Sequence, residues 1–340
     1  MTGPDHDVPS VRAMLARMHG ADPGELLLER RLIRGGLEAA SVSRLSVRYR
    51  DARGKRQVRT MIVKHLVGSA TREVGVYRAL LSTLPALTPR LLAADERRAG
   101  EAVLFLEALR PVSRWPWRDT AAAGSVLGQV ALLHQCIRSK NALSRLSAWD
   151  YEADLLASAE RTLEQLQRLR GVAPVFRSGA RWARRMVAAL PALRRHLLGF
   201  GPFGTTLIHG DLHSGNVIMR RRAGRNEPVL LDWARSRIGS PLEDVSSWLQ
   251  SLGAWEPEAR RRHDTLFAGY LAARGMEPRL GRDLRAAYWL AGASNALAGA
   301  LFHHLRVLAE PCGSRTLEWA SGRAAQDWLR VLRRADACWN

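Results

Sequence analysis

The hydrophobic pattern of the chain changes once, near residue 110. Before this point, short apolar or alternating stretches at 26–33, 42–50, 58–66 and 102–109 predict strands, and helical spacing recurs at 8–19 and 71–84. Beyond it, we expect helices at about 120–138, 150–170, 179–199, 243–252, 258–274, 281–308 and 316–335, with two short strands at 217–221 and 228–232. The pattern predicts an α+β fold with two unequal lobes. A small β-rich N-terminal lobe, with an antiparallel sheet plus one helix, spans 1–110, and a larger, mostly helical C-terminal lobe spans 111–340.

The bulk composition favours a folded protein without a membrane segment. Hydrophobic residues make up 46% of the 340 residues, which is enough for a substantial core. The first seven residues lack the basic start and apolar stretch of a signal peptide, and the longest apolar region, 290–302, is too short to span a bilayer. Three well-separated cysteines argue against a disulfide framework or a zinc site. We expect a cytoplasmic protein with reduced thiols.

The strongest chemical signal is an aspartate, Asp211, followed five positions later by Asn216, with Asp232 at the end of the next predicted strand. Phosphoryl transfer needs an aligned acceptor hydroxyl and metal ions that neutralise charge on the phosphates. In the protein-kinase arrangement one Asp accepts the hydroxyl proton, and an Asn and a second Asp bind Mg²⁺. The spacing here reproduces that arrangement, so we expect Asp211 to be catalytic and Asn216 and Asp232 to bind the metal.

A second constellation lies upstream, where Lys64 stands on an apolar predicted strand. A charge in such a place is costly unless it is paired, and Glu73 on the next helix is a natural partner. The order of strand lysine and helix glutamate is the one found in kinases, where the pair positions ATP. Taken alone, Lys64 fits an edge-strand lysine with its amine in water; the downstream motif favours the ATP interpretation.

Two further nucleotide contacts are weaker predictions. Gly35, Gly36 and Ser41 stand where a phosphate-covering loop is expected, although no G-x-G-x-x-G is present and two glycines fit a plain turn equally well. The stretch 104–109 stands where a hinge between the lobes is expected. Its backbone at Glu107 and Leu109 is a candidate for hydrogen bonds to adenine.

Together these motifs resemble the aminoglycoside phosphotransferase and choline kinase family. The resemblance rests on His209 to Asn216, on Leu231-Asp232-Trp233 and on 239–244, and it extends over roughly 25 to 330. It implies a protein-kinase-like fold and an ATP- and Mg²⁺-dependent kinase that phosphorylates a hydroxyl group. It also implies that His209 and Asp244 stabilise the catalytic loop. The chain departs from the family at Ser240, where Gly-Asp-Pro is frequent.

The charge distribution bears on the acceptor. Residues 111–240 carry +11 of the net +20. Between 161 and 195 only Glu164 is acidic, against nine arginines: 161, 168, 170, 177, 181, 184, 185, 194 and 195. In the resembled family this region helps to form the acceptor side of the cleft, and like charges repel at short range. The segment therefore disfavours polycationic aminoglycosides and favours another hydroxyl-bearing small molecule or an acidic peptide, although a solvated basic face explains the charge equally well.

Several functions stay open at this stage. Some relatives act in peptide natural-product pathways by phosphorylating Ser or Thr, which fits an acidic precursor peptide and a partner protein in such a pathway. An antibiotic-inactivating kinase is the alternative enzyme, and a pseudokinase scaffold is the alternative of another class, against which the complete residue set argues. Nucleic-acid binding rests on charge alone, because no reading motif accompanies the arginines. His134 is expected to be a hydrogen-bonded core histidine, and His303 and His304 have no metal partner at helical spacing.

Overall fold

A computed structural model describes residues 7–19, 22, 24–33, 39–51, 53–84, 86–98, 100–136, 149–201, 203–310 and 313–339. Contacts divide the chain into two units. Unit 1 comprises Met1–Pro111, Arg145–Ser147 and Val229–Arg235, and unit 2 comprises Val112–Ser144, Ala148–Pro228 and Ser236–Asn340. The chain therefore leaves unit 2 for seven residues and then returns to it.

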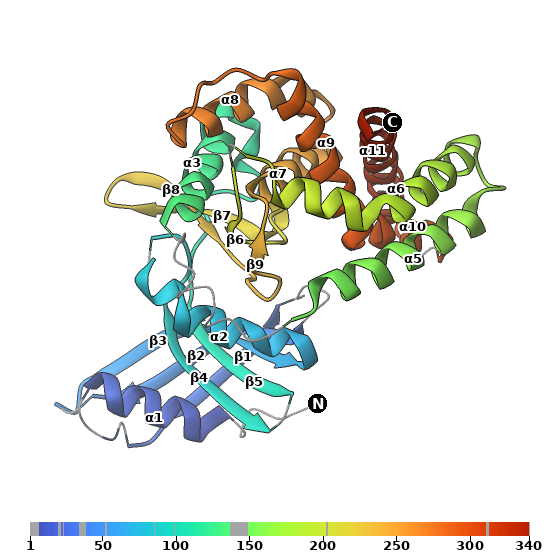
Figure 1. The fold of residues 1–340 in the computed structure, drawn as a ribbon. Coiled ribbons are helices and arrows are strands. Elements are labelled where there is room, and N and C mark those ends of the chain that lie inside the picture. The colour runs from blue at the N-terminus through green and yellow to red at the C-terminus, as the bar shows by residue number, and fades with distance from the viewer. Residues whose placement is uncertain are drawn as a thin grey trace. The chain divides into compact units, whose positions relative to one another are not determined.

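Unit 1 is built on an antiparallel sheet in the order β1-β2-β3-β5-β4 (Figure 1). Its helices are α1 (Val8–His19) and α2 (Arg72–Ala79), and its strands are β1 (Leu27–Ile33), β2 (Ala39–Arg50), β3 (Arg56–Val67), β4 (Leu91–Arg98) and β5 (Glu101–Glu107). The predicted strands are confirmed, but β4 was missed. Its sequence, Leu-Leu-Ala-Ala-Asp-Glu-Arg-Arg, does not alternate and ends in four charged residues.

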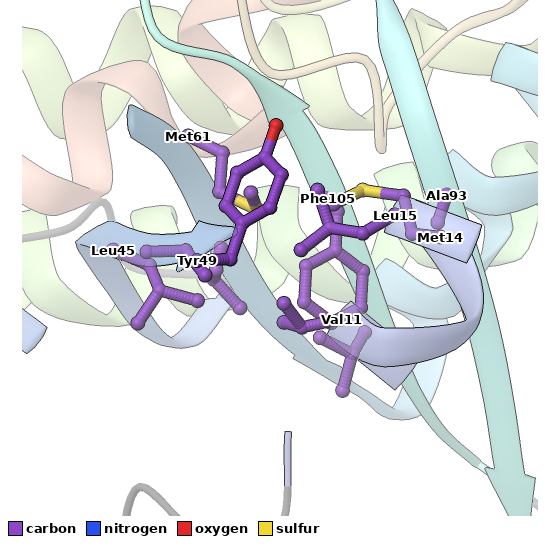
Figure 2. Close-up of a cluster of buried hydrophobic side chains, with 11 residues drawn as sticks. Val11, Met14, Leu15, Leu45, Tyr49, Met61, Ala93 and Phe105 are labelled. Atoms are coloured by element: carbon purple, nitrogen blue, oxygen red, sulfur yellow. The ribbon is translucent and has the colours of Figure 1, made fainter. Parts of the chain in front are cut away.

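Alternation along the strands gives the sheet one apolar face, which α1 covers. Val11, Met14 and Leu15 of α1 pack on odd-numbered residues of the strands (Figure 2). These sheet residues are Leu45, Val47, Tyr49, Met61, Val63, Ala93, Val103 and Phe105. Because side chains alternate between faces, the neighbouring Lys64 points to the opposite face. The period of two therefore sends a charged residue away from this core.

Unit 2 is mostly helical. Its helices are α3 (Thr120–Cys136), α5 (Tyr151–Leu169), α6 (Pro174–Leu198), α7 (Pro241–Trp255), α8 (His263–Ala273), α9 (Arg282–Asn295), α10 (Leu301–Ala309) and α11 (Arg315–Trp339). Helices α5 and α6 pack against each other, and α11 packs against α6, α7, α9 and α10 (Figure 1). Two small sheets join β6 (Thr206–Ile208) to β9 (Arg237–Gly239) and β7 (Val217–Arg222) to β8 (Arg225–Leu230).

The main departure from the expected helices is a break in the stretch 281–308. A π-helical segment, Ala296–Ala300, separates α9 from α10, and Gly299 within it has φ of 130°. Only glycine takes this conformation without strain, so the helix changes direction there. Strands β6 and β9 were also missed, because three residues are too few to show a period. No helix in the described part of the chain is long and apolar enough to cross a membrane.

Candidate active site

The buried amine of Lys64 lies between two carboxylates of unit 1. Its Nζ donates to Oε2 of Glu73 at 2.6 Å and to Oδ1 of Asp232 at 3.1 Å. The Lys64 side chain is 8% exposed and that of Glu73 is fully buried. Burial alone would lower the pKa of Lys64, but the two carboxylates raise it overall. The amine is therefore charged at neutral pH, and the structure brings together three of the residues singled out in the sequence.

Asp232 has an unusual backbone. Strand β8 ends at Leu230, so Asp232 lies two residues beyond the strand rather than at its end, and it has φ of 63°. This left-handed conformation costs a non-glycine residue of the order of 1 kcal/mol, and Asp tolerates it better than most. The Asp232 carboxylate accepts the Lys64 amine from this conformation, and left-handed non-glycine residues gather at functional sites.

The second carboxylate oxygen of Glu73 is hydrogen-bonded to the segment that contains Asp232. Its Oε1 accepts the backbone N–H of Trp233 at 3.1 Å. The indole N–H of Trp233 in turn donates to Thr88 Oγ1 at 3.1 Å, and Thr88 is hydrogen-bonded to the hydroxyl of Tyr77. Glu73 therefore fixes both the amine of Lys64 and the residue that follows Asp232.

In unit 2, the loop after β6 is anchored by Asp244 at the start of α7. Its carboxylate accepts the backbone N–H groups of His209 at 2.7 Å and Gly210 at 2.9 Å. Gly210 has φ of 80°, which favours glycine. Asp244, for which the resemblance implied a stabilising role, is therefore hydrogen-bonded to two backbone N–H groups of this loop.

The same loop presents Asp211 and Asn216. The Asn216 Nδ2 donates to the backbone O of Asp211 at 3.0 Å and to its Oδ2 at 3.2 Å. The Asp211 side chain is 41% exposed, so a solute can reach its carboxylate. Asn216 therefore orients Asp211 while leaving its own Oδ1 available.

We did not predict from the sequence the group of charged residues that is hydrogen-bonded to this loop. Arg237 donates to the carbonyl of Gly210 at 3.2 Å and to Glu243 at 2.9 Å, and Arg194 donates to the same Glu243 oxygen at 2.7 Å. Glu243 also completes a capping box with Ser240, whose side chain caps α7. The Ser-x-x-Glu spacing was a findable signal, and Ser240 supplies the capping oxygen.

His134 is buried, as expected, and it has a role that the sequence did not indicate. Its Nε2 lies 3.2 Å from Oδ2 of Asp244 and its Nδ1 lies 2.8 Å from the hydroxyl of Tyr270. Burial lowers the pKa of His134, so the ring is neutral. Its Nε2–H therefore donates to Asp244, and its Nδ1 accepts from Tyr270.

Of the weaker predicted nucleotide contacts, the structure describes Ser41, Glu107 and Leu109. Gly35 and Gly36 lie outside the described residues. Ser41 is half-buried on β2, beside a register shift between Ala39 and Ser41. The N–H of Glu107 is already donated to the carbonyl of Arg90 at 2.9 Å, whereas Leu109 follows β5 and has no backbone partner among the described residues.

The basic segment is helical, and two of its arginines are paired. Arg194 is buried beside Glu243 and Glu152, and Arg185 pairs with Asp336. Arginines 161, 168, 170, 177, 181, 184 and 195 are exposed. Most of the positive charge therefore faces solvent.

The oxygen atoms that Asn216 and Asp232 offer suit Mg²⁺ better than a metal that takes all its ligands from protein side chains. No group of three or more His, Cys, Asp or Glu side chains suited to a metal occurs among the described residues. Asn216 offers an amide oxygen, and Asp232 offers Oδ2 because its Oδ1 faces Lys64. Mg²⁺ is commonly held by one or two such oxygens together with substrate phosphates and water.

Comparison with known proteins places these residues in context. The model of the phosphotransferase enzyme family matches residues 63–290. This range includes Lys64, Glu73, Asp211, Asn216 and Asp232. No match was found among curated protein sequences.

Solved structures share the fold. The ethanolamine kinase of Plasmodium vivax is 13% identical with a TM-score of 0.59, over 90% of this chain and 84% of that one. A microcompartment-associated aminopropanol kinase is 15% identical with a TM-score of 0.58, over 97% and 98%. An amicoumacin kinase in complex with AMP-PNP and Ca²⁺ is 17% identical with a TM-score of 0.54, over 88% of each chain. The predicted α+β, kinase-like fold is confirmed.

Proposed function

Because the chain belongs to the phosphotransferase enzyme family, we propose that it transfers the γ-phosphate of ATP to a hydroxyl group with the help of Mg²⁺. The family match confirms the resemblance drawn from the motifs and the expected class, a phosphotransferase with an alcohol group as acceptor. The nucleotide, the metal and the roles of individual residues are the proposal.

Asp211 is the proposed catalytic base. The acceptor oxygen attacks the γ-phosphorus, the bond from phosphorus to the β,γ-bridging oxygen breaks, and ADP leaves. The hydroxyl proton passes to the Asp211 carboxylate, which is exposed and oriented by Asn216. The observation that carries this proposal is this pair of residues on a loop anchored by Asp244.

Lys64 is proposed to bind the α- and β-phosphates of ATP, with Glu73 holding its amine in place. Leu109 supports an adenine contact because its backbone groups have no partner among the described residues. The N–H of Glu107 is donated to the carbonyl of Arg90, so it is not available for such a contact. Gly35, Gly36 and Ser41 stay proposed as phosphate contacts.

Mg²⁺ would be held by Oδ1 of Asn216 and Oδ2 of Asp232. When bound, the ion neutralises charge on the β- and γ-phosphates. The residues themselves contribute orientation: Lys64 and the left-handed backbone set the direction of the Asp232 carboxylate. The hydrogen bonds to Asp211 set the direction of Asn216.

The acceptor is proposed to be a hydroxyl compound that is not a polycation. His213 lies 3.8 Å from the Asp211 carboxylate, and the rings of His303 and His304 on α10 pack edge to face with centroids 5.2 Å apart. Burial lowers the pKa of both α10 histidines, with His213 contributing, and that of His304 falls to about 4. The neutral imidazoles of His303 and His304, together with the exposed arginines of α5 and α6, offer little compensation for several ammonium groups.

The test is an assay of ADP release with ATP and Mg²⁺ over a panel of acceptors. The panel contains ethanolamine and 1-aminopropan-2-ol, a kanamycin-type polycation, and Ser/Thr peptides with and without an acidic segment. We expect turnover with a non-polycationic acceptor and loss of turnover in Asp211→Asn, with Mg²⁺-dependent ATP binding retained.

Efficient turnover of the polycation would overturn the acceptor argument and leave the reaction intact. ATP binding without turnover, unchanged by Asp232→Ala, would instead indicate a scaffold that binds a partner protein.

A further inference from the structure

One face of α11 carries a row of charged residues. Arg323, Asp327, Arg330 and Arg334 stand at intervals of four, three and four residues, so they share one side of the helix. Arg323 and Arg330 are about 10 Å apart along the helix axis, with the one carboxylate between them. Asp327 is buried and both arginines are half-buried.

A second element faces this row. Arg260, in the 3₁₀ turn Pro257–Arg262 before α8, forms an ion pair with Asp327. The α7 backbone also lies close, because a side chain at Gly253 would meet Asp327 Oδ2 at 3.1 Å. The carboxylate of Asp327 is therefore enclosed and already paired.

Burial, together with the charges of Arg330 and Arg260, lowers the pKa of His263, at the start of α8, to about 4, so its ring is neutral and adds no charge. The nearby Asp264 is occupied by Arg285, at 2.9 Å. We name Arg260, Arg323 and Arg330 the α11 cationic cluster.

The cluster holds more positive charge than its surroundings compensate. Burial lowers the pKa of Arg260, and Arg330 and Arg323 lower it further. Burial likewise lowers the pKa of Arg330, with Arg334 and Arg333 adding repulsion. Half-buried like charges are costly, and the repulsion falls when an anion lies among them.

The donors of the cluster are also unsatisfied. The Nε atoms of Arg260, Arg323 and Arg330 are buried without a hydrogen-bond partner in the described part of the chain. The guanidinium carbon of Arg323 lies 5.1 Å from the ring centre of Trp319. Three arginine N–H groups, one in the 3₁₀ turn Pro257–Arg262 and two on α11, therefore lack an acceptor, and leaving a buried donor without one is unfavourable.

We propose that the α11 cationic cluster is a binding site for a small phosphate-type oxyanion. Guanidinium groups match the oxygens of phosphate in geometry and charge, and neighbouring arginines can share one tetrahedral anion. The site lies on the 3₁₀ turn Pro257–Arg262 and on α11, and it uses none of the residues proposed for phosphoryl transfer. Free phosphate and a phosphomonoester group present the same chemistry to it.

The test is calorimetric titration at constant ionic strength with inorganic phosphate and, separately, with O-phosphoserine. AMP-PNP and Mg²⁺ are kept saturating so that the proposed nucleotide site is occupied. The variants are R323Q/R330Q and a matched control, R161Q/R168Q, which removes two exposed arginines of α5.

We expect the wild type and the control to bind with equal affinity and R323Q/R330Q to bind at least about tenfold more weakly, since tenfold corresponds to the loss of about one good ionic hydrogen bond. Tighter binding of one titrant identifies the source of the oxyanion. If R323Q/R330Q fails to fold, R323Q alone replaces it, because the Arg323 side chain has no ion pair or hydrogen bond to the described residues and the change removes none. Equal binding by cluster and control variants, or no binding by the wild type, would overturn the proposal.

Discussion

The carboxylate of Asp244 accepts the backbone N–H of His209 at 2.7 Å, across 35 residues of sequence. Because backbone groups make this contact, the loop conformation depends on Asp244 whatever side chains the loop carries. The His209 ring then accepts the N–H of Asp211 at 3.3 Å. The buried carboxylate of Asp244 therefore influences the position of Asp211, the proposed base, through His209.

Replacing Asp244 by asparagine should destabilise unit 2. Burial would raise the pKa of Asp244, but the hydrogen bonds from His134 and the backbone of Gly210, with the electrostatic effect of His209, lower it overall. The amide removes the negative charge and sets an NH₂ group against donors, so we expect a loss of roughly 3 kcal/mol in the free energy of unfolding, measured in urea. The control is Asp264→Asn, whose exposed pair with Arg285 should contribute less than about 1 kcal/mol. Equal losses of unfolding free energy in both variants would contradict the stabilising role given to Asp244.

Lys64→Met should leave two carboxylates without their cation. Glu73 is fully buried, so the expected loss of stability is roughly 3 kcal/mol. In the double variant Lys64→Met/Glu73→Gln the uncompensated charge is gone, and the loss should be clearly smaller than the sum of the single losses. Additive losses, measured by chemical unfolding, would show that the two groups are not coupled.

Gly292→Ala should separate α9 from its neighbours. A Cβ at Gly292 would stand 2.7 Å from Ser246 Oγ and 2.7 Å from Val331 Cγ1, so we expect a loss of about 1–3 kcal/mol. Gly269→Ala in α8 is the matched control, because nothing lies within 4 Å of its Cβ position. That change should stabilise by about 0.5–1 kcal/mol through helix propensity. Thermal unfolding of both variants checks the opposite signs.

Stability should fall in mild acid, partly through His304. Burial lowers its pKa to about 4 in the folded state, whereas an unfolded histidine takes up its proton near 6.5. Between these pH values the unfolded chain binds more protons than the folded one. The stability that depends on a neutral His304 is therefore fully present above about pH 6.5 and is lost as the pH falls towards 4. At pH 5 the loss in unfolding free energy from this residue is at most about 2 kcal/mol. His304→Gln should reduce the difference between unfolding free energies at pH 7.5 and pH 5; an unchanged difference would contradict the prediction.

The parts of the site that could be predicted from sequence are those with local signals. The apolar pattern placed Lys64 on a strand, and the cost of an unpaired buried charge indicated Glu73 as its carboxylate partner. The spacing of Asp211 and Asn216 is itself a local feature.

The remaining contacts join residues with no common period. His134 meets Asp244 across 110 positions, and nothing near either residue indicates the other. The left-handed backbone of Asp232 and the break at Gly299 also depend on tertiary packing. Three-residue strands such as β6 lie below the length at which a pattern can be recognised.

The return of Val229–Arg235 to unit 1 has a consequence for the order of folding during synthesis. The first 111 residues emerge from the ribosome with all five strands of the sheet, but Lys64 and Glu73 then lack Asp232 and the N–H of Trp233. At usual rates of translation, 5–20 residues per second, that segment follows after roughly 10 seconds. The charge network of the nascent unit 1 is therefore incomplete during this time, and a ribosome stalled before residue 232 would hold a sheet in which Lys64 lacks Asp232.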